Sequence, residues 1–90
     1  MKKRGRLEII KDILKTMQES RNSIRYTPLL RKSNMSTSKF NEYYSELIRK
    51  GLIIETKSSA GEKRLSLTQK GFNFLEKYKT IISFIEEFEL

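Results

Sequence analysis

Residues 34 to 53, NMSTSKFNEYYSELIRKGLI, constrain the fold more than any other stretch, because both ends of one helix can be located in them. Ser36 is a residue type that caps helix N-termini by accepting a hydrogen bond from a free backbone N–H. Gly51 follows an amphipathic run and stands where a left-handed C-terminal cap is needed. The stretch therefore predicts a helix over about 37–50 that begins and ends at defined residues.

The faces of this helix follow from its apolar spacing. Phe40, Tyr44 and Leu47 form the predicted buried stripe, and Tyr43 is expected to be half-packed beside it. Met35 and Phe40 occupy the two positions of a hydrophobic staple, which sets the angle at which the chain enters the helix. The positions predicted to face outward are Ser38, Lys39, Asn41, Glu42 and Ser45.

The rest of the chain predicts five further elements and one layout. In chain order we expect a helix over 7–19, a short strand at 24–26, and a short helix that is capped by Thr27, begins with Pro28 and ends by Asn34. A hairpin with strands 52–57 and 63–67 follows, and then a helix that is capped by Thr68 and runs almost to Leu90. Two helices joined by a tight turn and followed by a basic hairpin predict a winged helix-turn-helix, a mainly helical α+β fold. The expected divisions are a flexible basic arm (1–6), a winged helix-turn-helix domain (7–67) and a C-terminal helix (68–90).

Composition favours a polyanionic partner. The 90 residues carry a net charge of +8, which is unevenly placed. Residues 1–70 hold 17 basic and 7 acidic residues, a net of +10, whereas residues 76–90 hold 2 and 4, a net of −2. A basic body beside an acidic tail suggests nucleic acid for the body and another role for the tail, although a Lys-rich surface can also serve solubility alone. No segment resembles a membrane span or signal peptide, so we expect a cytoplasmic, nucleoid-associated protein.

Catalysis finds little support in the sequence. Cysteine and histidine are absent and the four glycines stand apart, so disulfides, the usual zinc sites and a Gly-rich phosphate loop are not expected. We therefore expect no enzyme activity, no metal and no cofactor.

The stretch at 34–53, followed by a hairpin and by LTQKG (Leu67, Thr68, Lys70 and Gly71), resembles an archaeal winged-helix family of small DNA-binding proteins and predicted transcriptional regulators. The resemblance covers about residues 6–88. It implies double-stranded DNA as the partner, in a transcriptional regulator or a chromatin-type protein. It also implies a long last helix that forms a dimeric coiled coil.

The candidate DNA-contacting residues lie on the predicted second helix of the helix-turn-helix and around it. In such a unit, the N-terminal half of this helix enters the major groove and the hairpin wing reaches the backbone or minor groove. Asn41 could bond adenine, Glu42 a cytosine amino group, and Lys39 guanine or phosphate. The alternative is an ordinary solvated face and, for the wing, charges that prevent edge-to-edge aggregation. The full set is Ser36, Thr37, Ser38, Lys39, Asn41, Glu42, Ser45, Arg25, Arg31, Lys32, Lys57, Lys63 and Arg64.

The last helix carries an apolar seam with heptad spacing, which predicts a homodimer interface. Its members are Phe74, Tyr78, Ile81, Ile82, Ile85 and Phe88. The same seam could instead dock a different protein. The rival hypothesis for the whole chain is a winged-helix protein–protein interaction module that binds no nucleic acid.

Overall fold

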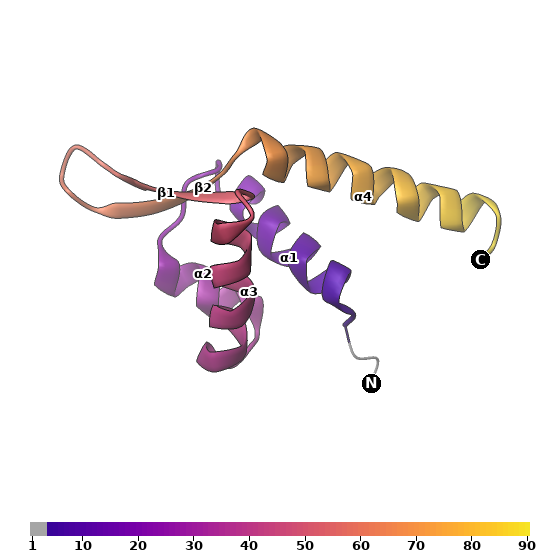
Figure 1. The fold of residues 1–90 in the computed structure, drawn as a ribbon, viewed down its shortest axis with the longest axis horizontal. Helices are drawn as coiled ribbons and strands as arrows, with labels where there is room; N and C mark the ends of the chain where they lie inside the picture. Colours follow the sequence, from indigo (N-terminus) through magenta and orange to yellow (C-terminus); the bar gives the residue numbers. More distant parts are fainter. Residues whose placement is uncertain (1–3) are drawn as a thin grey trace.

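The computed structural model describes residues 4–90 as four helices and a two-stranded antiparallel hairpin (Figure 1). The elements are α1 (Arg6–Glu19), α2 (Tyr26–Ser33), α3 (Thr37–Arg49), β1 (Ile53–Lys57), β2 (Lys63–Leu67) and α4 (Gln69–Glu87). This order confirms the predicted winged helix-turn-helix with a long C-terminal helix. The wing and α4 project from opposite sides of the body formed by α1, α2 and α3 (Figure 1).

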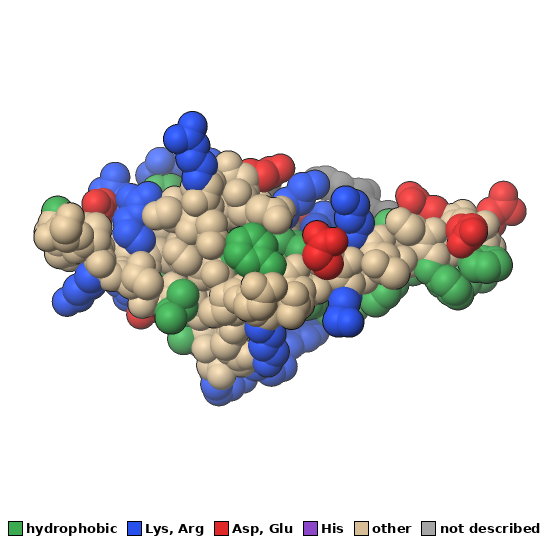
Figure 2. All heavy atoms as spheres, turned by 90° about the horizontal axis from the view of Figure 1, so that it is seen from above, with side chains coloured by type: hydrophobic (Ala, Val, Ile, Leu, Met, Phe, Trp, Pro, Cys, Tyr) green, Lys and Arg blue, Asp and Glu red, His purple; other side chains and the backbone are tan. Residues whose placement is uncertain are grey.

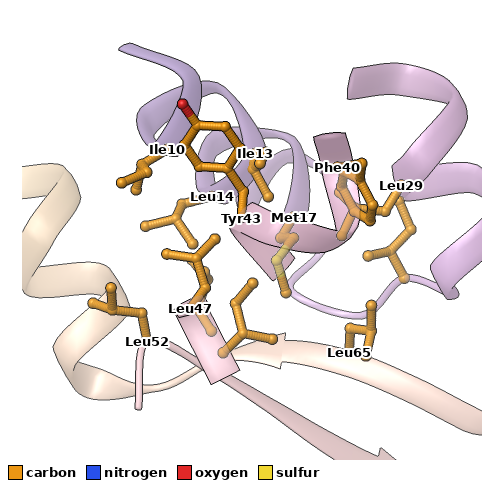
Figure 3. Packing of buried hydrophobic residues seen from close by; sticks show 13 residues of the cluster. Ile10, Ile13, Leu14, Met17, Leu29, Phe40, Tyr43, Leu47, Leu52 and Leu65 are labelled. Carbon is orange, nitrogen blue, oxygen red and sulfur yellow. The ribbon is translucent and has the colours of Figure 1, made fainter. Parts of the chain in front are cut away.

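One hydrophobic core lies between the three body helices and the base of the hairpin. Leu14 and Met17 from α1, Leu29 from α2, Phe40 from α3 and Leu65 from β2 are all completely buried (Figure 3). Each full burial of such a side chain contributes about 1.5–3 kcal/mol. The core therefore fixes α3 against the body and leaves its opposite face free.

Both ends of α3 are capped as predicted. The Ser36 hydroxyl accepts a hydrogen bond from the Lys39 N–H at 3.2 Å. Gly51 has φ +75°, and its N–H donates to the Ile48 carbonyl at 3.1 Å. The Leu52 N–H donates to the Leu47 carbonyl at 2.9 Å, which completes a Schellman motif.

Two details of the helices differ from the prediction. Helix α2 begins at Tyr26 after Arg25, so Thr27 is not its cap, and Pro28 stands in the first turn, where its missing N–H leaves no bond unmade. On α3 the two adjacent tyrosines exchange roles. Tyr43 is buried with Phe40 and Leu47, whereas Tyr44 is half-buried.

The wing pairs Ile53 with Leu67 at its base and Lys57 with Lys63 at its tip. The predicted short strand near 24–26 is a single bridge, in which Ile24 and Leu65 exchange hydrogen bonds of 3.1 and 2.8 Å. The bridge joins the turn after α1 to the wing and holds the hairpin at the edge of the core.

The predicted basic arm is only partly described. Its first residues, 1–3, lie outside the described residues. Arg4 is half-buried, pairs with Asp12 at 3.0 Å and donates to the Ser33 carbonyl at 2.9 Å, while Arg6 begins α1. These two arginines therefore belong to the folded body and not to the arm.

Thr68 caps the N-terminus of α4, as the sequence predicts, because its hydroxyl accepts a hydrogen bond from the Gly71 N–H at 3.1 Å. Phe74 and Leu75 pack at the margin of the core, and the second half of the helix extends beyond the body (Figure 1). Among residues 4–90, no helix is long and apolar enough to cross a membrane.

Candidate nucleic-acid interface

The outward face of α3 is exposed along its first three turns. The five side chains predicted to face outward, Ser38, Lys39, Asn41, Glu42 and Ser45, are all exposed, and so are Ser36 and Thr37 at the helix start. Lys39 and Glu42 lie 3.5 Å apart as an i,i+3 ion pair with both side chains more than half exposed. An exposed pair of this kind contributes little to stability, so an incoming phosphate or base can displace it.

Asn41 is held by Tyr26, which is not among the predicted site residues. The Tyr26 hydroxyl, from the start of α2, donates to Asn41 Oδ1. The Tyr26 ring packs edge-on against Phe40 at 5.5 Å and against Tyr44 at 5.4 Å, so the hydroxyl has a fixed position. Because Asn41 Oδ1 faces the Tyr26 hydroxyl, the two Nδ2 hydrogens of Asn41 point away from that hydroxyl. A contact between residues 15 positions apart has no sequence pattern that could have revealed it.

Two lysines face each other across the wing. Lys57 and Lys63 are direct cross-strand partners, a like-charge arrangement that is unfavourable in an isolated hairpin. Lys63 Nζ lies 3.0 Å from Glu55 Oε2, which relieves one of the two charges. A hydrogen bond from the Tyr44 hydroxyl and the nearby Lys63 ammonium lower the pKa of Glu55, so this carboxylate stays charged.

Arg64 has a structural role. Its Nε donates to the Ser23 hydroxyl at 2.9 Å and its Nη2 donates to the Ser23 carbonyl at 3.1 Å. Glu62 lies 3.8 Å from Arg64 and 2.8 Å from Arg25. The guanidinium of Arg64 thus ties β2 to the turn after α1, whereas Arg25, the more exposed of the two, is only paired with a carboxylate.

A hollow of about 460 Å³ separates the start of α2 from the wing. Arg25, Arg31 and Lys63 line it together with Glu62, so three predicted contacts from different elements meet here. Lys32 is exposed on the last turn of α2 and lines a different depression, between α1 and α2. Lys32 is therefore separate from the group formed by Arg25, Arg31 and Lys63.

Another ion-pair cluster joins α1 to α3. Glu46 accepts a hydrogen bond from Arg6 and one from Lys50 at 2.9 Å, and the pKa of Glu46 is consequently lowered to about 2. The Arg6 guanidinium also lies 5.9 Å from the centroid of the Tyr43 ring. This cluster orients α3 on the body, and no periodicity in the sequence indicates it.

Three of the six residues of the predicted seam on α4, Ile81, Ile85 and Phe88, are exposed in the single chain, and Ile82 is half-buried. Phe74 and Tyr78 are half-buried, whereas Ile81 is 53% and Phe88 58% exposed. Figure 2 shows basic side chains spread over the body and wing, with apolar and acidic side chains together at the far end of α4. Within residues 4–90, no group of three or more His, Cys, Asp or Glu side chains could hold a metal ion.

Comparisons with known proteins agree with this geometry. A family model described as winged helix-turn-helix matches residues 3–86, whereas no curated protein matches the chain. Among solved structures, Sso10a-2, a DNA-binding protein from Sulfolobus solfataricus, superposes with a TM-score of 0.75 at 20% identity, over 96% of this chain and 86% of that one. The PcaV transcriptional regulator from Streptomyces coelicolor gives 0.72 at 17% identity, over 88% of this chain and 59% of that one. F-93 of SSV1 gives 0.62 at 31% identity, over 88% and 91%. The match over residues 3–86, together with the body, wing and capped third helix, establishes that the chain belongs to the winged helix-turn-helix family.

Proposed function

We propose that the protein binds double-stranded DNA, with α3 in the major groove and the wing on the backbone or in the minor groove. The observation that carries the proposal is the cross-strand pair of Lys57 and Lys63 at the tip of a wing that flanks an exposed, capped helix. Two facing cations cost stability in the free protein, and a phosphate between them reverses the sign of that interaction. The two solved relatives described as a DNA-binding protein and a transcriptional regulator support the same function.

Asn41 is the base-reading residue that the geometry favours. Because the Tyr26 hydroxyl occupies one side of Asn41 Oδ1, the amide is oriented before DNA arrives. An oriented amide can bond adenine N6 and N7 without losing further side-chain freedom. Lys39 and Glu42 flank it on the exposed face, while Ser36 and Thr37 can donate to phosphate from the helix start.

We further propose that two copies pair through α4. Ile81, Phe84, Phe88 and Leu90 are each more than half exposed, and large apolar side chains gathered on one surface mark interaction sites. A second copy would cover them. Residues 7–67 would then form the DNA-reading part and residues 68–90 the self-association helix.

The dimer has a direct test in sedimentation equilibrium. Ile81→Glu should convert a concentration-dependent dimer to a monomer without unfolding it, because Ile81 is 53% exposed and makes no core contact. Thr80→Glu, one position away, adds the same charge beside the seam and should leave the dimer intact. A wild type that is monomeric at high micromolar concentration would contradict the proposal.

The DNA proposal is tested by titrating the protein into a labelled duplex of about 30 base pairs and following anisotropy at several salt concentrations. Each lost phosphate contact reduces the slope of log K against log salt by about 0.9, so Lys57→Gln with Lys63→Gln should reduce it by about 1.8. The control Lys77→Gln with Lys79→Gln removes the same two charges from α4 and should leave the slope near its wild-type value.

Two results would separate the alternatives. Equal slope changes in both double variants would mean that net charge, and not the wing, binds the polyanion. If the wild type did not bind even at low salt, the DNA proposal would fail, and the interaction-module hypothesis would take its place. In the proposed role the protein acts as a transcriptional regulator or a chromatin-type protein, and its action involves no catalysis.

A further inference from the structure

The C-terminal end of α3 and the start of α4 are joined by bonds to three consecutive carbonyl groups. Lys70 Nζ donates to the Lys50 carbonyl at 2.7 Å, and the Thr68 hydroxyl donates to the Gly51 carbonyl at 2.5 Å. The Thr68 N–H donates to the Leu52 carbonyl at 3.2 Å. The turn that caps α3 is thereby bonded, residue by residue, to the turn that begins α4.

Gly71 lets the two segments approach this closely. A Cβ at this position would lie 2.5 Å from the Leu52 carbonyl oxygen, well inside contact distance, and 3.2 Å from a methyl group of Leu67. The Thr68 hydroxyl also accepts from the Gly71 N–H at 3.1 Å, so one side chain serves both helices at once. The Lys70 ammonium additionally lies at the negative end of the α3 dipole, which favours its position.

These bonds do more than the local fold requires. The Schellman motif already satisfies the Leu47 and Ile48 carbonyls from within the α3 cap, so α3 would end correctly without α4. The additional bonds instead restrict the angle between α3, which carries the exposed reading face, and α4, which carries the exposed apolar seam.

We propose that Thr68, Lys70 and Gly71 are positioning residues that fix this angle and so set the separation of the two reading helices in a dimer. This inference rests on the proposed pairing through α4. The 19 residues of α4 form a lever about 28 Å long. Over that length, a change of about 10° in the angle between α3 and α4 would displace α3 by about 5 Å. This displacement is larger than the 3.4 Å rise of one base pair.

The separation can be measured because the sequence contains no cysteine. A single Ser45→Cys substitution on the exposed face of α3 carries one nitroxide label per protomer. Pulsed electron paramagnetic resonance then measures the distance between the labels on the two α3 helices of the dimer. We expect one narrow distance distribution in the otherwise wild-type background. Lys70→Met should broaden it, and Lys70→Met with Thr68→Val should broaden it further.

The control Lys77→Met removes the same charge from the middle of α4 and should leave the distribution narrow. Circular dichroism and sedimentation identify any loss of helix or of the dimer. If the double variant does not fold, the single variant Lys70→Met still tests the inference, because it retains the Thr68 cap. A distribution as narrow in Lys70→Met as in the wild type, with fold and dimer intact, would overturn the inference. If the otherwise wild-type protein gave no distance signal between two labels, the proposed dimer would be contradicted. The proposed role of Thr68, Lys70 and Gly71 in spacing the two α3 helices would then fail with it.

Discussion

Replacing Gly71 with alanine has two opposite effects on the free energy of unfolding, one from helix propensity and one from crowding against Leu52. The sign of the measured change therefore shows which effect is larger. Alanine is about 1 kcal/mol more favourable than glycine inside a helix, and propensity alone therefore predicts a more stable protein. The structure predicts the reverse, because the added Cβ would lie 2.5 Å from the Leu52 carbonyl oxygen. That oxygen cannot simply move away, since it accepts the Thr68 N–H at 3.2 Å.

The magnitudes favour destabilisation. Overpacking costs about 1–3 kcal/mol, and losing the bond between Thr68 and Leu52 adds about 0.5–1.5 kcal/mol. After subtraction of the propensity gain, Gly71→Ala should lower the free energy of unfolding by about 2 kcal/mol. In a domain of this size, that corresponds to a Tm lower by about 8–16 °C.

Thermal unfolding followed by circular dichroism measures this at one fixed protein concentration, because an oligomer's Tm depends on concentration. Ser83→Ala, on the exposed part of α4, is the matched control and should be neutral or slightly stabilising. A Gly71→Ala protein as stable as the wild type would refute the argument that close approach of the two segments requires glycine.

Three further outcomes follow from the contacts. Ser36→Ala removes the acceptor for the Lys39 N–H and should cost about 1 kcal/mol in urea unfolding, whereas Ser36→Asp should retain the cap. The pKa of Glu46 in the folded protein, about 2, lies below its ordinary 4.5, so its contribution to stability is present above pH 4.5 and lost as the pH falls toward about 2. Glu46→Gln should therefore flatten the acid-induced loss of stability, and an unchanged pH profile would contradict the role of the Arg6 pair. Arg64→Gln should lower the free energy of unfolding by about 1 kcal/mol through its bonds to Ser23, whereas Lys57→Gln should not, as thermal unfolding of both variants would show.

Three features decided by neighbours in sequence were predictable. The Ser36 cap, the left-handed Gly51 and the Thr68 cap each depend on a few consecutive residues, and all three are confirmed. Which of Tyr43 and Tyr44 is buried does not depend on neighbours in sequence alone. Both fit an apolar stripe between Phe40 and Leu47, and the packing of α1 buries Tyr43 instead.

Contacts between residues distant in sequence were not predictable, and they change how the charge must be interpreted. Arg64 bonds Ser23 across 41 positions and Arg6 bonds Glu46 across 40, so basic residues that looked available for a partner are used within the fold. Pairing of this kind differs in strength from residue to residue. Arg64 donates two hydrogen bonds to Ser23 and is partly buried. The exposed ion pairs of Lys39 with Glu42 and of Arg25 with Glu62 each contribute at most about 1 kcal/mol.

A phosphate can therefore replace the partner of an exposed cation far more readily than that of Arg64. Lys57 and Arg31 have no ion-pair partner among the described residues 4–90, and Lys63 has one exposed partner, Glu55. Since counterion release rewards each neutralised phosphate about equally, the cations that give up least on binding contribute most to affinity. The net charge of +8 therefore favours attraction of a polyanion, and the internal pairing would determine where on the surface a polyanion binds. On this reasoning we propose that a polyanion would contact α2 and the wing tip beside the exposed face of α3, while the bonds of Arg64 to Ser23 hold the wing in place.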